Sequence, residues 1–173
     1  MSQTALACQI LLLAYHQLTT LVDLHPFNGV RNASRGERLA ESGINAILMS
    51  LAPIGFALGI RGLMLYGVIY YFILFFFELV IWWVPYFSAP SGRWLRVYNF
   101  LLSVATTSFS ETDPLANWTD CHVRLHSSTI TLLPRGRGPI VPNLEHTILH
   151  AWTALTAITT LAAFLAQLAV RQS

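Results

Sequence analysis

The sequence is dominated by long apolar runs that alternate with short polar stretches. A helix needs about 20 mostly apolar residues to cross the hydrocarbon core of a membrane, because each residue advances the helix by about 1.5 Å. Four segments reach this length with few or no charged residues inside them. They cover about residues 5–24, 38–60, 62–87 and 144–170. The pattern therefore predicts four transmembrane helices.

Two of these helices carry recognisable start signals. Ser34 is followed three residues later by Glu37, which is the pattern of a capping box: each side chain accepts a hydrogen bond from the other residue's backbone N–H group. Asn143 directly follows Pro142 and has a side chain suited to cap the last helix. We therefore expect Ser34 and Asn143 to be N-cap residues.

The chain between the third and fourth segments is more polar. Residues 94–110 mix apolar positions with Ser, Thr and Asn, which predicts a helix lying in the membrane interface; the alternative is a fifth, tilted span. Residues 111–143 contain repeated proline and glycine and are expected to form an irregular extramembrane cap. Within this cap, His122–His126 and Thr129–Leu133 suggest two short strands.

These elements predict an all-α integral membrane protein with a single polytopic domain over residues 1–173. Its fold would be a bundle of four transmembrane helices, with an interfacial helix and an irregular cap between spans three and four. The composition agrees, because 54% of residues are hydrophobic and only 10% are charged, against about 25% charged residues in soluble domains. This composition argues against a water-soluble monomer. The net charge of +2 comes from scattered residues and gives no footprint for nucleic acid.

The arginines predict an orientation in the membrane. With four spans, the loops after spans one and three hold eight arginines, and the opposite side holds only Arg61 and Arg171. Cytoplasmic loops carry the excess of basic residues, so both termini are expected outside the cytoplasm, in a cytoplasmic (inner) membrane. A fifth span would change the split to six against four, which indicates no orientation.

Ionisable groups inside a membrane are costly, so each one is a candidate for function. Polar side chains recur at helical spacing along the first span and again along the last. The first stripe contains Gln9, His16 and Asp23, and the second contains His146, His150, Thr153 and Thr160. With four spans, the ionisable residues of these stripes, together with Glu78 of the third span, gather at one membrane face. A shared site at this face is the main functional expectation.

We expect this site to bind a metal ion. His146 and His150 lie four residues apart on one helix face, a spacing that can chelate one ion. Imidazoles combined with carboxylates suit zinc or non-haem iron. The expected catalytic residues are Glu78 and Glu145, and the expected metal ligands are five histidines: His16, His122, His126, His146 and His150.

Structural interpretations stay open for several of these residues. His146 would merely cap the membrane interface, and His150 would bond a neighbouring helix. His122 and His126 are more often ordinary surface histidines than ligands when they stand in a polar loop. For His16, a hydrogen bond between helices is the favoured single interpretation. Glu78 would be a hydrogen-bonded carboxyl rather than an acid or base.

The leading functional hypothesis is a metal-assisted enzyme that acts on a small or lipid-like substrate at the membrane edge. One alternative is a non-catalytic subunit that packs against a partner membrane protein, or a second copy, through the G-x-x-x-G pattern of Gly55 and Gly59. Another is a small proton-coupled carrier in which Glu78 and His16 titrate. A haem held between His16 and His150 is a further variant. Membrane lipid is the expected partner in all of them.

Overall fold

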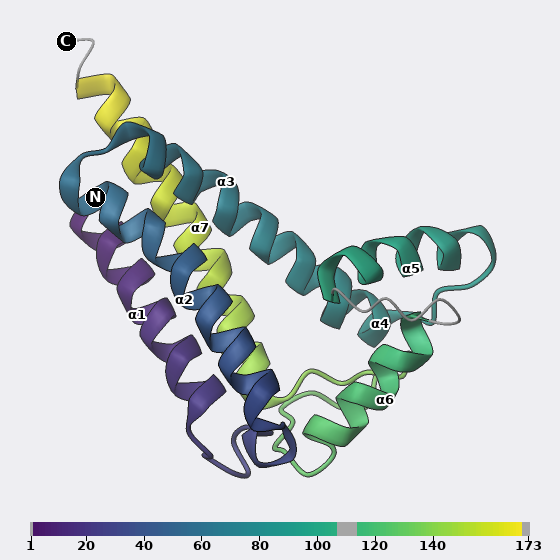
Figure 1. Ribbon diagram of the computed structural model, residues 1–173. Helices are drawn as coiled ribbons and strands as arrows, with labels where there is room; N and C mark the ends of the chain where they lie inside the picture. Colours follow the sequence, from purple (N-terminus) through teal and green to yellow (C-terminus); the bar gives the residue numbers. More distant parts are fainter. Residues whose placement is uncertain (1, 107–113, 171–173) are drawn as a thin grey trace. The chain divides into compact units, whose positions relative to one another are not determined.

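The computed structural model describes residues 2–106 and 114–170, and helices are the regular elements found there (Figure 1). They are α1 (Ser2–Leu21), the 3-10 helix η1 (Val30–Asn32), α2 (Arg35–Leu58), α3 (Arg61–Glu78), the π-helix η2 (Leu79–Trp83), α4 (Val84–Phe87), α5 (Gly92–Thr106), α6 (Pro114–His126) and α7 (Leu144–Val170). The all-α fold class is thus confirmed for the described residues. The two short strands are wrong: His122–His126 is the last part of α6, and Thr129–Leu133 forms no strand.

Four of the described helical stretches are long and apolar enough to cross a membrane. They are Ser2–Leu21, Arg35–Leu58, Arg61–Phe87 and Leu144–Val170. The four candidate spans of the sequence analysis are confirmed in this coarse sense, whereas the topology and the choice of membrane stay predictions. Helix α5 covers most of the segment expected in the interface, and the last part of that segment lies outside the described residues.

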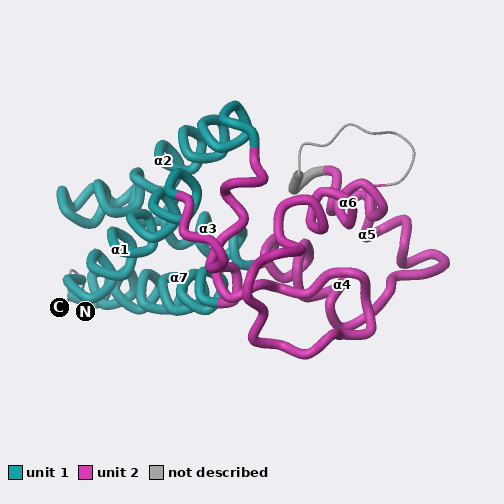
Figure 2. The backbone as a smooth tube through the Cα atoms, turned by 90° about the horizontal axis from the view of Figure 1, so that it is seen from below, with its two compact units in different colours: residues 1–22, 34–75, 148–173 teal, residues 23–33, 76–147 magenta. Residues whose placement is uncertain are grey.

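The contacts divide the chain into two compact units (Figure 2). Unit 1 consists of Met1–Val22, Ser34–Phe75 and Ile148–Ser173, and unit 2 consists of Asp23–Ala33 and Phe76–Thr147. Each unit therefore draws on segments that are distant in the sequence. That the whole chain forms one domain stays a prediction.

Unit 1 is a packed group of helices with an apolar interior. One cluster joins Ala5 of α1, Phe56 of α2, Met64 of α3 and Phe164 of α7. A second cluster repeats this arrangement with its own buried residues: Leu12, Met49, Ala52, Tyr71 and Ala157. Four helices thus share one core, as expected for a bundle.

Polar groups of the first and last spans meet inside this core. Gln9 on α1 and Thr160 on α7 are both fully buried, and Gln9 Nε2 donates a hydrogen bond of 2.9 Å to Thr160 Oγ1. Inside a membrane, a hydrogen bond between helices satisfies groups that would otherwise be costly to bury. Gln9 and Thr160, which belong to the two predicted polar stripes, therefore have a structural role: they join α1 to α7.

Gly55 and Gly59 lie where α2 turns into α3. Gly55 is buried, and a Cβ added there would lie 2.5 Å from Leu63 Cβ of the same chain. Gly59 ends α2 in the left-handed conformation, with φ of 67°, which glycine adopts without steric cost. The G-x-x-x-G pattern thus has an explanation within the chain, and packing of a partner membrane protein at these glycines stays a prediction.

Helix α2 begins as its sequence predicts. The Ser34 side chain accepts a hydrogen bond from the Glu37 backbone N–H, and the Glu37 carboxylate accepts one of 2.7 Å from the Ser34 backbone N–H. The capping box is confirmed, and it places the helix start a few residues before the apolar run.

Unit 2 is built around a break in the third candidate span. Pro85 has no backbone N–H, so the carbonyl of Ile81, four residues earlier, lacks its usual helical donor. The backbone instead widens into the π-helix η2, where the Val84 N–H reaches back to the Leu79 carbonyl. The indole N–H of Trp118 on α6 donates to the Ile81 carbonyl at 3.0 Å, which fastens α6 to this break.

The long loop between α6 and α7 packs directly on α4. Gly138 N–H donates to the Tyr86 carbonyl at 3.2 Å, and the Tyr86 hydroxyl donates to the Pro134 carbonyl at 3.1 Å. A Cβ on Gly138 would lie 1.5 Å from the Pro85 carbonyl oxygen. The close approach of the two backbones therefore requires glycine at this position.

We expect the substitution Gly138→Ala to lower the free energy of unfolding of the full-length protein in detergent by at least about 1–3 kcal/mol, because the added methyl group overlaps backbone atoms. Gly43→Ala is the matched control, since nothing lies within 4 Å of a Cβ there and the position is helical. The control should leave the unfolding transition unchanged or raise it slightly. Equal transitions for the two variants would contradict the packing described for Gly138.

Candidate functional site

Three histidines of unit 2 surround one indole ring. Trp82, on the π-helix, stacks on His146 of α7 with ring centroids 4.0 Å apart. Its ring also contacts His122 and His126 of α6, at centroid distances of 5.0 and 5.4 Å. His126 in turn lies 4.9 Å from His146 between ring centroids. The fold therefore gathers imidazoles from two helices on one aromatic side chain.

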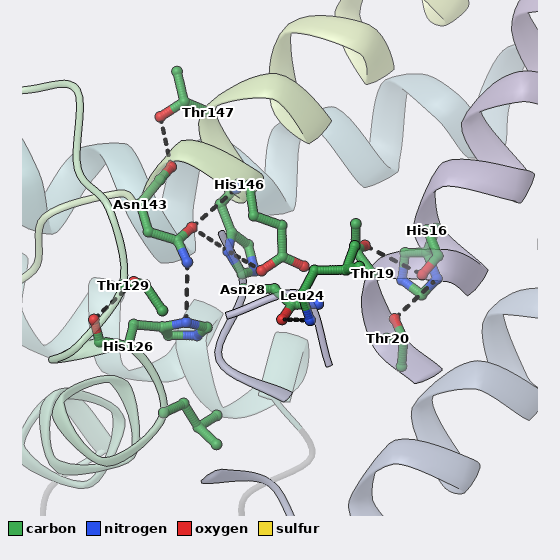
Figure 3. Close-up of polar contacts among 12 residues, drawn as sticks. His16, Thr19, Thr20, Leu24, Asn28, His126, Thr129, Asn143, His146 and Thr147 are labelled. Carbon is green, nitrogen blue, oxygen red and sulfur yellow. Dashed lines mark hydrogen bonds and ion pairs between the residues drawn. The ribbon is translucent and has the colours of Figure 1, made fainter. Parts of the chain in front are cut away.

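Asn143 joins two of these histidines (Figure 3). Its Oδ1 accepts hydrogen bonds from the backbone N–H of His146, at 3.0 Å, and from the His146 ring nitrogen Nδ1, at 2.7 Å. Its Nδ2 lies 3.2 Å from Nδ1 of His126. The N-cap predicted for Asn143 is confirmed, and the same side chain also links α6 to the first turn of α7.

Three residues of this group are close enough to share a metal ion. His126, Glu145 and His146 each offer one ligand atom, and these atoms lie within 4.8 Å of one another. Glu145 is buried, and its Oε2 lies 3.8 Å from Nδ1 of His146. Two imidazoles and a carboxylate form the kind of ligand set that catalytic zinc sites use.

Residues 23–33 pack against the end of α6 that carries His126. Asn32 Nδ2 donates to the Leu125 carbonyl at 3.1 Å, and Arg124 donates to the Asn32 carbonyl at 3.0 Å. A Cβ added to Gly29 would lie 2.2 Å from the Leu125 carbonyl oxygen and 2.9 Å from His126 Nδ1. The loop therefore encloses this side of the histidine group, and only glycine fits at position 29.

Burial keeps the α6 histidines neutral. Loss of water, and after it the neighbouring His122, lowers the pKa of His126 to about 3. Burial likewise lowers the pKa of His122 to about 4, against the opposing effect of a hydrogen bond to the Val141 backbone. Neutral imidazole is the form that binds metal ions, so both residues are ready to act as ligands at neutral pH.

His122 retains a ring nitrogen without a hydrogen-bond partner among the described residues. This atom is Nδ1, and the side chain is only 7% exposed. Buried polar atoms are nearly always satisfied by the protein, water or a ligand, so such an atom needs an explanation. The sequence interpretation of His122 as an ordinary surface histidine is therefore wrong.

The remaining predicted site residues have different surroundings. Glu78 is buried in unit 2, at the end of α3. His150 and His16 belong to unit 1 and are also buried. His16 Nε2 lies 3.7 Å from the Glu41 carboxylate of α2, which fits a contact between helices. The expected gathering of Glu78, His146 and His150 at one face stays a prediction.

Asp23 has a structural partner instead of a place in the site. Its exposed carboxylate pairs with Arg31 at 3.2 Å and accepts the backbone N–H of His25. The hydrogen bond from His25, followed by that from Arg31, lowers the pKa of Asp23. This residue therefore fixes the loop after α1.

Trp82 is the main site residue that the sequence analysis missed. Together with Trp83 and Tyr86 it has the appearance of an aromatic belt at the membrane surface. In the structure, Trp82 and Tyr86 are buried at 5% and 7% exposure. The available signal was Pro85, because a proline within an apolar helix predicts a local change of helix geometry and hence of which side chains face inward.

The comparisons with known proteins add no family to this picture. No family model, curated protein or solved structure matches the chain. The described residues support a helical protein with candidate membrane spans and a histidine–glutamate group that could hold a metal ion.

We expect the metal-free protein to lose stability below pH 6.5. The unfolded chain protonates His122 and His126 near pH 6.5, whereas the folded protein resists protonation down to about pH 4 and about pH 3, so acid favours unfolding. Between the pKa of the unfolded chain and that of the folded protein, each histidine should lower the free energy of unfolding by about 1.4 kcal/mol for each unit by which the pH falls. Chemical denaturation in detergent with a chelator, at pH 7.5 and 5.5, measures the change. A double His122→Gln, His126→Gln variant should show a flatter slope, and a slope as steep as that of the wild type would contradict the assignment.

Proposed function

We propose that the chain is an integral membrane protein and a metal-assisted enzyme. Its histidine–glutamate group would bind the catalytic zinc ion. The observation that carries the proposal is the group itself: ligand atoms of His126, Glu145 and His146 within 4.8 Å of one another in a largely buried setting. Zinc is bound by nitrogen and carboxylate oxygen in this combination, and three protein ligands leave a fourth position for water.

The chemistry supplied by such an ion is activation of water. An ion held by His126, Glu145 and His146 would lower the pKa of a bound water to near neutral and would polarise a carbonyl or phosphoryl group for hydrolysis. Glu78, which like Glu145 is a buried carboxyl of unit 2, is our candidate for the general acid or base. The proposed reaction is thus hydrolysis of an ester or phosphoester.

The place of the group in the chain favours a lipid-like substrate. Glu145 and His146 stand in the first turn of α7, which is one of the four candidate membrane spans. The end of a span is where the hydrocarbon core meets the polar headgroups. An ester or phosphate of a lipid headgroup lies at that depth, which suits the proposed site.

We expect the purified full-length protein, loaded with Zn²⁺ and then dialysed, to retain about one zinc ion per chain. His126→Ala and His146→Ala should each reduce the retained zinc severalfold, because each removes a ligand. His25→Ala is the control, since His25 is not among the three residues of the group and its removal should not change the zinc content. Elemental analysis measures the ratio. Equal zinc in all four proteins, or none in the wild type, would refute the metal centre.

The enzymatic part has a separate test. Zinc-loaded protein in vesicles of phosphatidylethanolamine and phosphatidylglycerol should produce cleaved lipid, detected by mass spectrometry, and the metal-free protein should not. Glu78→Gln should retain zinc but lower the rate about 100-fold or more, as expected when an acid–base group is lost. Asp120→Asn, which changes an exposed carboxyl on α6, is the matched control. Identical lipid profiles with and without zinc would contradict a lipid hydrolase.

A further inference from the structure

The amide of Asn143 has an orientation that can be assigned from the helix cap. The backbone N–H of His146 points at one end of the amide, with the two heavy atoms 3.0 Å apart. A backbone N–H only donates, so this end must be the carbonyl oxygen Oδ1, and the NH₂ group Nδ2 must be at the other end. The histidine rings play no part in this assignment.

Each end of the amide then determines where a neighbouring imidazole carries its proton. Oδ1 lies 2.7 Å from Nδ1 of His146, so that nitrogen must carry a hydrogen atom. Nδ2 lies 3.2 Å from Nδ1 of His126, so that nitrogen must offer its lone pair. In the neutral rings, His146 is consequently protonated on Nδ1 and His126 on Nε2.

We propose that Asn143 is the positioning residue of this centre: it gives His126 and His146 opposite tautomers, and it competes with the metal ion for His126 because it holds the proton of that ring on Nε2. The competition rests on the zinc site proposed above, whereas the tautomers do not. His146 can bind an ion through Nε2 while it keeps its bond to Asn143, as metal-bound histidines commonly do. While His126 accepts a hydrogen bond from Asn143 on Nδ1, its Nε2 carries the proton and has no lone pair for an ion. To bind an ion through Nε2, the ring must move its proton to Nδ1 and give up this hydrogen bond.

The surroundings hold Asn143 in this position. The residue is fully buried, and its backbone carbonyl accepts hydrogen bonds from both the backbone N–H and the hydroxyl of Thr147, at 2.9 and 2.8 Å (Figure 3). Gly29 packs closely against the ring of His126, since a Cβ added to Gly29 would lie 2.9 Å from Nδ1 of His126. A rotated amide would face the His146 N–H with its own N–H group. The tautomers are therefore coupled to the cap of α7.

Long-range proton–nitrogen NMR on the full-length, metal-free protein with ¹⁵N-labelled histidine tests the assigned tautomers of His126 and His146. The wild type should show His146 protonated on Nδ1 and His126 protonated on Nε2. In Asn143→Asp, whose carboxylate keeps the cap but replaces the NH₂ group, Nδ1 of His126 should gain the proton while His146 stays the same. Asn45→Asp, on α2 of unit 1, is the matched control and should leave both rings unchanged. A wild-type His126 with its proton on Nδ1 would overturn the proposal, whichever variants fold.

The affinity of the protein for zinc tests the competition between Asn143 and the metal ion for His126. Asn143→Asp should bind Zn²⁺ at least about tenfold more tightly than the wild type, since its carboxylate holds the proton of His126 on Nδ1, leaves the lone pair of Nε2 for the ion and adds a negative charge. Asn143→Leu should bind about 10–100-fold more weakly, because Nδ1 of His146 loses its acceptor. Weaker binding by Asn143→Asp than by the wild type would overturn the competition. Absence of zinc binding in the wild type would instead overturn the proposed function and leave the tautomer result standing.

Discussion

The contact between Trp82 and His146 is the interaction on which the organisation of unit 2 depends. The indole stacks on His146 and contacts both histidines of α6, so one aromatic ring joins all three imidazoles. Its position follows from Pro85, which removes one helical hydrogen bond and widens the preceding turn into a π-helix. Without this widening, the periodicity of an ordinary helix would direct Trp82 elsewhere. The backbone N–H that Pro85 lacks thus determines where the Trp82 ring lies in the site.

Burial gives this polar group its chemical character. An imidazole enclosed by aromatic rings and backbone is held neutral, and a neutral imidazole has a lone pair for a metal ion or a hydrogen-bond donor. Hydrogen bonds offset the cost of burying the other members: Asn143 bonds to both His126 and His146, and Asn32 satisfies the end of α6. A buried and bonded group of this kind is rigid, which is what a ligand site requires.

Local patterns in the sequence were sufficient for much of the fold. Apolar runs predict the candidate spans, and the Ser34–Glu37 pair and Asn143 predict helix starts, because caps depend only on neighbouring residues. The predicted strand at His122–His126 is wrong because apolar and polar residues alternate there over too few positions to distinguish a strand from a helix. Its contacts decide the outcome: Trp118 bonds to the π-helix, and this partner is 37 residues away in the sequence.

The site was harder to predict than the fold because its members come from three separate segments. His146 and Glu145 are adjacent and were expected to act together, whereas their grouping with His126 depends on how the loop 127–143 returns to α7. That return requires glycine at position 138, where two backbones touch, and no pattern within the loop itself reveals the contact. For the same reason the sequence could not show that Gly55 faces Leu63 of its own chain.

X-ray absorption at the zinc edge, measured on the full-length protein with one bound zinc ion, tests the central claim most directly. We expect the scattering of two imidazole rings together with oxygen donors, at distances of about 2.0–2.2 Å. Sulfur donors would place the ion at a cysteine, and oxygen donors alone would place it on surface carboxylates. Either of these spectra would contradict a zinc centre formed by His126, Glu145 and His146.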